Sequence, residues 1–135
     1  MSDIVIFDTS VLVDELRTGR HSKKIESVDG LLRTSAVVLA ELWRRASYNA
    51  ERKFLFALTK NYPVLTPTER NWIESGDILA RIRADRGFAP AKLRDLHCDV
   101  LIALTARSHG ARLITTNRTD FELINSYRDF KLEVW

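Results

Sequence analysis

Residues 4–7 (Ile-Val-Ile-Phe) form an uninterrupted apolar run that Asp8 follows at once. A run without alternation between apolar and polar residues is typical of a parallel strand buried on both faces. We therefore expect a buried strand over residues 3–7 of an α/β domain. Asp8 then stands at the carboxyl end of this strand, which is where open α/β sheets form their ligand sites.

Strand and helix patterns alternate along the rest of the chain. Thr9 or Ser10 is expected to cap the first helix, which Gly19 ends. The alternation predicts a three-layer α/β/α fold with a mostly parallel sheet of about five strands. No repeat or linker interrupts it, so we expect a single domain over residues 1–135. The further strands are expected at residues 31–35, 63–65, 112–116 and 131–135, the last at an edge, and the further helices at residues 22–28, 36–46, 47–60, 69–85, 93–109 and 121–124.

The composition is that of an ordinary globular protein, with 45% hydrophobic and 29% charged residues in a chain of 135. Cys98 is the only cysteine, so no internal disulfide can form and nothing indicates an oxidising compartment. No signal-peptide pattern opens the chain, and no apolar run reaches the length of a membrane span. We therefore expect a cytoplasmic protein without a membrane partner.

The net charge of +3 is small, and the distribution of the basic residues is more informative. Arg44 and Arg45 follow Glu41 closely, and another basic series runs from residue 81 to residue 94. Basic groups around an acidic centre suit a polyanion such as RNA. The alternative is that each group forms a solvated helix face.

Acidic and amide side chains recur at the ends of separate elements. Asp8 is one, and Glu41, Asp99 and the pair Asn117 and Asp120 are the others. Gathered carboxylates repel one another unless a cation lies between them, and Mg²⁺ and Mn²⁺ bind carboxylate oxygens and water. A divalent cation at such a site stabilises charge on a phosphodiester and activates water. The pattern therefore favours a metal-dependent nuclease.

Four segments in order also resemble one family over nearly the whole chain. This chain is similar to the PIN-domain ribonucleases, and its brevity resembles the VapC-type toxins of toxin–antitoxin pairs. The segments that carry the resemblance are IFDTSVL (residues 6–12), SAVVLAEL (35–42), DVLIALTAR (99–107) and LITTNRTDF (113–121).

The resemblance implies an endoribonuclease that depends on Mg²⁺ or Mn²⁺. It assigns Asp8, Glu41 and Asp99 as metal ligands and catalytic residues. For the fourth position it leaves a choice between the amide oxygen of Asn117 and the carboxylate of Asp120. As a toxin, the protein would form a homodimer and would be inhibited by an antitoxin that inserts an Arg or Lys toward the acidic site.

Several residues near these acids have two interpretations. Thr9, Ser10 and Thr116 would hydrogen-bond the carboxylates or a metal-bound water, or else serve helix capping and strand packing. Arg44 and Arg45 would hold substrate phosphates or an antitoxin carboxylate. Asp8 could instead be a turn residue that caps the next helix.

Asp95 lies four residues before Asp99, where many relatives have a Gly/Pro-rich approach. It is either an extra carboxylate of the site or, as we favour, the cap of the helix that follows.

Two functions of other classes compete with the nuclease. The first is a PIN-like module that binds RNA or a partner without cutting, which the uncharged Asn117 favours. The second is a phosphatase or phosphotransferase on a related fold, because a strand that ends in Asp8-Thr9-Ser10 superficially resembles the start of such enzymes.

Overall fold

The computed structural model describes residues 3–135. The described chain contains five strands, β1 (Ile4–Phe7), β2 (Leu31–Ser35), β3 (Val64–Leu65), β4 (Arg112–Thr115) and β5 (Lys131–Val134). The helices are α1 (Thr9–Thr18), α2 (Ser22–Ser27), α3 (Ala36–Arg45), α4 (Asn49–Asn61), α5 (Glu69–Arg86), α6 (Pro90–Ser108) and α7 (Arg118–Tyr127). None of the helices in this part of the chain combines the length and the apolar character that crossing a membrane requires.

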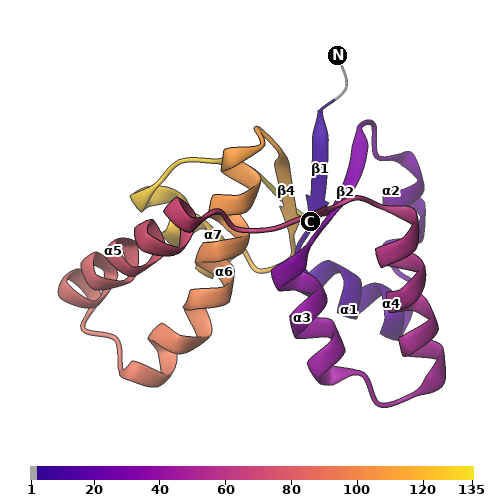
Figure 1. Ribbon diagram of the computed structural model, residues 1–135, viewed down its shortest axis with the longest axis horizontal. Helices are drawn as coiled ribbons and strands as arrows, with labels where there is room; N and C mark the ends of the chain where they lie inside the picture. Colours follow the sequence, from indigo (N-terminus) through magenta and orange to yellow (C-terminus); the bar gives the residue numbers. More distant parts are fainter. Residues whose placement is uncertain (1–2) are drawn as a thin grey trace.

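All strand pairs are parallel, and the order across the sheet is β3-β2-β1-β4-β5. Helices α1 to α4 lie to one side of the strands in Figure 1 and α5 to α7 to the other. The expected three-layer α/β/α fold with a parallel sheet is confirmed, and β5 is an edge strand as predicted.

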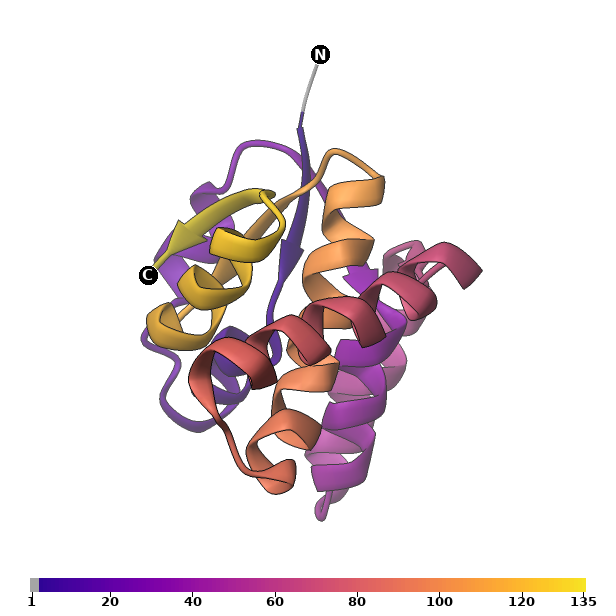
Figure 2. The ribbon, with the colours of Figure 1, turned by 90° about the vertical axis from the view of Figure 1, so that its left-hand side faces the viewer.

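The apolar run of residues 4–7 forms the central strand of the sheet, between β2 and β4. Val5 and Ile6 are fully buried, and so are Leu113 and Ile114 on β4. Helix α6 crosses close to these strands in Figure 2, and its buried side chains include Leu96, Val100 and Ile102. The central strands are apolar on both faces because helices cover both.

Several helix boundaries differ from the prediction. Helix α1 is capped by Asp8 itself, whose Oδ2 accepts from the backbone N–H of Ser10, so neither Thr9 nor Ser10 is the cap. Helix α6 begins at Pro90 and not at residue 93. A proline fits the first turn of a helix because the N–H that it lacks has no partner there.

The helix after β4 is also longer than expected, because α7 covers residues 118–127 and not 121–124 alone. Asn117 caps it through its amide oxygen, which accepts from the backbone N–H of Asp120. The side chains of Ser35 and Thr68 cap α3 and α5, and Pro67 precedes the cap of α5 and is not in the helix.

Candidate metal centre at the carboxyl ends of β1 and β4

The strand order reverses at β1. From β1 the chain continues to β2 and β3 on one side of β1, and β4 later pairs with its other side. A crevice forms at such a switch point, outside the carboxyl ends of the strands. The structure has a cavity of about 450 Å³ there, lined by Asp8, Thr9, Ser10, Val13, Asp14, Glu41, Arg44, Arg45, Arg94, Asp95, Cys98, Asp99, Thr116 and Asn117.

Asp8 is 2% exposed and lies at the centre of a hydrogen-bond network. Its Oδ2 accepts from the hydroxyls of Ser10 and Thr115, each at 2.8 Å. The other carboxylate oxygen, Oδ1, is buried and has no hydrogen-bond partner. A buried carboxylate oxygen without a partner is costly unless a cation or a ligand satisfies it.

The threonine that contacts Asp8 is Thr115 and not the predicted Thr116. Residues 7 and 114 are paired in the β1–β4 register, so the next residue, Thr115, comes beside Asp8. Thr116 lines the cavity and contributes its backbone N–H, which donates to the Ser10 hydroxyl at 3.1 Å. Thr115 could have been predicted from the sequence, because it is a polar residue that follows the apolar Leu113 and Ile114 at the end of a strand.

Glu41 reaches the cavity from α3. This helix begins directly after β2, where the Ser35 hydroxyl accepts from the backbone N–H groups of Val37 and Val38. The Glu41 carboxylate accepts a 2.8 Å hydrogen bond from the hydroxyl of Thr9 on α1. The contact between α1 and α3 thus orients Glu41 toward the end of β1.

Asp99, on α6, is the acid most affected by its surroundings. Burial, together with the negative charges of Asp8, Glu41 and Asp120, raises its pKa to about 8. The charge of Lys92 acts in the opposite sense. The structure therefore brings Asp8, Glu41 and Asp99 to one cavity, at the cost of repulsion among them.

The residues present fit a hard divalent cation. Asp8 offers an unpartnered buried oxygen, Asp99 is destabilised in its charged form, and both line one cavity with Glu41. Within residues 3–135, however, no three Asp, Glu, His or Cys side chains already converge as a ligand set.

The two candidates for the fourth position bind each other. Asn117 donates through Nδ2 to the Asp120 carboxylate at 3.1 Å, while its own amide oxygen accepts from the Asp120 backbone. Lys92 holds the other Asp120 oxygen at 2.9 Å, a contact that sequence reasoning missed. Asn117 lines the cavity, whereas Asp120 is not among its lining residues.

Basic side chains surround the mouth of the cavity. Arg44 and Arg45 line it as predicted, and Arg94 joins them from α6. In the described chain none of the three lies within 4 Å of a carboxylate. Asp95 also lines the cavity, but it lies inside α6 and is not its cap, because the helix begins five residues earlier.

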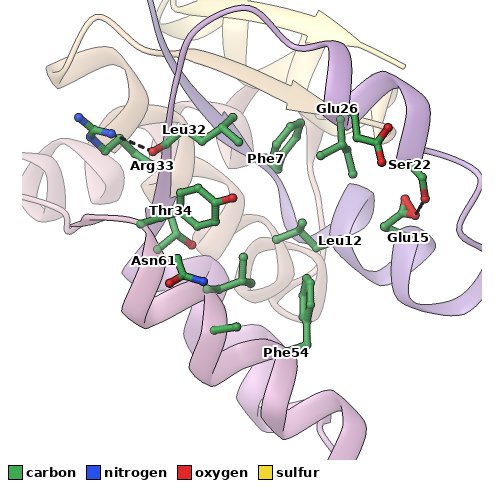
Figure 3. Close-up of a pocket in the computed structure, with 14 residues that line it drawn as sticks. Phe7, Leu12, Glu15, Ser22, Glu26, Leu32, Arg33, Thr34, Phe54 and Asn61 are labelled. Atoms are coloured by element: carbon green, nitrogen blue, oxygen red, sulfur yellow. Dashed lines mark hydrogen bonds between the residues drawn. The ribbon is translucent and has the colours of Figure 1, made fainter.

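A second cavity, of about 380 Å³, is mainly apolar. Phe7, Leu12, Leu32 and Phe54 face it from β1, α1, β2 and α4 in Figure 3. Its acids, Glu15 and Glu26, lie on α1 and α2. The acidic cluster and its chemistry thus belong to the other cavity.

The geometry defines an α/β protein with an acidic pocket at the switch point of a parallel sheet. A family model described as PIN domain matches residues 5–125, so this chain belongs to the PIN domain family. A comparison with curated protein sequences finds no significant match.

Solved structures of similar fold include several toxin–antitoxin assemblies. VapBC2 from Rickettsia felis bound to a DNA fragment from their promoter has a TM-score of 0.72 and 19% identity, over 98% of each chain. DNA-bound VapBC from Salmonella typhimurium has a TM-score of 0.63 and 22% identity, over 100% of this chain and 99% of that one. VapBC-5 from Mycobacterium tuberculosis has a TM-score of 0.58 and 21% identity, over 98% of each. At these identities the likeness establishes the fold.

Proposed function

We propose that this protein is an endoribonuclease in which Asp8, Glu41 and Asp99 hold Mg²⁺ or Mn²⁺. The observation that carries the proposal is the unpartnered, buried Oδ1 of Asp8 in a cavity that Glu41 and Asp99 also line. Membership of the PIN domain family supports the same assignment. When bound, a divalent cation neutralises charge on a phosphodiester and lowers the pKa of an attacking water.

The chain's own residues orient the site and bind the polyanion. Ser10 and Thr115 hold the Asp8 carboxylate at the cavity, and Thr9 holds Glu41 there. Three arginines at the mouth hold RNA phosphates on either side of the scissile bond, and they are Arg44, Arg45 and Arg94.

The direct test is cleavage of a single-stranded RNA by the purified chain with Mn²⁺. Cleavage is expected with the native protein and is expected to fall at least about a hundredfold in Asp8→Asn and Asp99→Asn, because each removes charge from the site. Asp77→Asn is the matched control, since Asp77 is exposed on α5 and pairs with Arg81. Unchanged cleavage in both site variants excludes the proposal.

We further propose that the protein acts in the cytoplasm as the toxin of a toxin–antitoxin pair and forms a homodimer. The fold likeness to VapBC assemblies supports this role. An antitoxin is expected to direct a Lys or Arg at the acidic pocket, whose carboxylates repel one another. Expression of the chain alone should arrest growth, and Asp99→Asn should not. Normal growth alongside cleavage in vitro would exclude the toxin role and leave the nuclease intact.

One observation favours a non-cleaving PIN-like module as the second candidate. The carboxylates do not yet converge as a ligand set in the described residues. Calorimetric titration with Mn²⁺ separates the two functions. Saturable binding that Asp8→Ala abolishes supports the nuclease, and no saturable binding supports the module.

A further inference from the structure

The fourth acidic residue of the site has no free oxygen. One oxygen of Asp120 accepts from Lys92 at 2.9 Å and the other from Asn117 at 3.1 Å. The Asp120 side chain is 19% exposed, so its charge is largely withdrawn from water and compensated by Lys92. Asp8 differs, because one of its carboxylate oxygens is buried and has no hydrogen-bond partner.

The position of Lys92 follows from the start of α6 at Pro90. Because the helix begins at Pro90, Lys92 lies in its first turn, where its side chain spans to the first turn of α7. The contact therefore joins two helices that flank the end of β4. The Lys92 side chain is 40% exposed, so it reaches Asp120 from the solvent side of the site.

The pair stands beside the candidate metal centre and not in it. Asp120 does not line the cavity that holds Asp8, Glu41 and Asp99. It is nevertheless near enough to raise the pKa of Asp99, which Lys92 lowers. A lysine ammonium is a compact positive charge with three donors. Here it binds the Asp120 carboxylate at the position that a metal cation would otherwise take.

We propose that Lys92 is a positioning residue that holds Asp120 out of the metal centre, so that the site binds one divalent cation and not two. This inference rests on the proposed function. Asp8, Glu41 and Asp99 would form the single cation site. Asn117 keeps Asp120 and the start of α7 in register. Loss of the lysine charge would leave Asp120 as an uncompensated carboxylate at the flank of an already acidic site, where a second cation is favoured.

The test counts Mn²⁺ ions per chain, by calorimetry and by the electron paramagnetic resonance signal of free Mn²⁺. The native protein is expected to bind one ion. Lys92→Met should bind a second, weaker ion, and Lys92→Met combined with Asp120→Asn should bind one again. Lys92→Arg keeps the charge and should bind one.

Lys131→Met is the matched control. Lys131 also pairs with an aspartate, Asp3, at 3.9 Å, but at the amino-terminal ends of the strands, where β1 and β5 begin. Its loss should leave the count at one. Asp120→Asn alone gives a second reading that does not depend on how Lys92→Met folds. It should still bind one ion, with a Kd raised by no more than roughly tenfold, because the charge of Lys92 is then left uncompensated beside the site.

Two ions in the native protein, one ion in a folded Lys92→Met variant, or loss of Mn²⁺ binding in Asp120→Asn would each overturn the inference while leaving the nuclease proposal in place. Absence of Mn²⁺ binding by the native chain would overturn both. The two failures are therefore distinguishable.

Discussion

The Thr115 hydroxyl donates a 2.8 Å hydrogen bond to the carboxylate of Asp8, although the two residues are 107 positions apart in the chain. Both side chains stand at the ends of paired parallel strands, and both are buried. The central strand pair therefore sets the orientation of the most buried acid of the site.

Replacing Thr115 by valine keeps the shape of the side chain and removes this donor. A hydrogen bond to a charged group contributes about 1.5–3 kcal/mol, so Mn²⁺ affinity and RNA cleavage should fall about tenfold or more. Thr116→Val is the matched control, because Thr116 acts on the site through its backbone N–H. Equal losses in the two variants would show that the Thr115 hydroxyl does not orient Asp8.

The raised pKa of Asp99 predicts a pH-dependent stability of the metal-free protein. The folded-state pKa of about 8 lies above the ordinary value of 3.8, so folding favours the protonated form. The unfolded chain is ionised between these values, and the free energy of unfolding should therefore decrease as pH rises from about 4 to about 8 and then level off.

Asp99→Asn should remove that decrease and, at about pH 8, should stabilise the metal-free protein by at least about 1.4 kcal/mol, the free energy of one pKa unit. Thermal melts at about pH 5 and about pH 8, with and without Mn²⁺, measure the effect. Mn²⁺ should raise the Tm of the native chain and not that of the variant. A native Tm that does not depend on pH in this range would contradict the charge repulsion described above.

The arginines at the mouth of the cavity should contribute to RNA binding through phosphates. In an Asp99→Asn background, which is expected to be inactive, Arg44→Gln and Arg94→Gln should each weaken binding of single-stranded RNA. The slope of log K against log salt should fall by about 0.7 for each phosphate that the variant no longer binds. Fluorescence anisotropy at several salt concentrations measures it. Arg52→Gln, exposed on α4, should leave the slope unchanged.

Gly30, directly before β2, lies where the structure has no room for a side chain. A Cβ at this residue would lie 2.6 Å from the backbone oxygen of Asp3, and its φ of +150° disfavours other residues. Gly30→Ala should destabilise the protein by more than Gly87→Ala, which costs about 1 kcal/mol for its left-handed φ but meets open space. Chemical denaturation measures both. Similar losses would mean that β1 moves easily to accept the methyl group.

Short-range patterns predicted most of the fold. The apolar run of β1 and the Ser35 cap are local features, and each depends on residues only a few positions apart. The same holds for Asp8 at the end of β1, whereas Glu41 and Asp99, which were expected at element ends, lie inside α3 and α6. The cap of α1 was assigned to Thr9 or Ser10 because Asp8, Thr9 and Ser10 have comparable capping preferences. The start of α6 was placed too late because its N-cap, Ala89, makes no side-chain cap.

The sequence by itself determined that Asp8 stands at the carboxyl end of a buried parallel strand, because the apolar run of residues 4–7 ends there. The tertiary structure alone decided which side chains meet there. Thr115 and not Thr116 contacts Asp8 because the β1–β4 register places alternate side chains on opposite sides. Lys92 meets Asp120 because α6 and α7 flank the same strand end, and no local pattern encodes a contact across 28 residues.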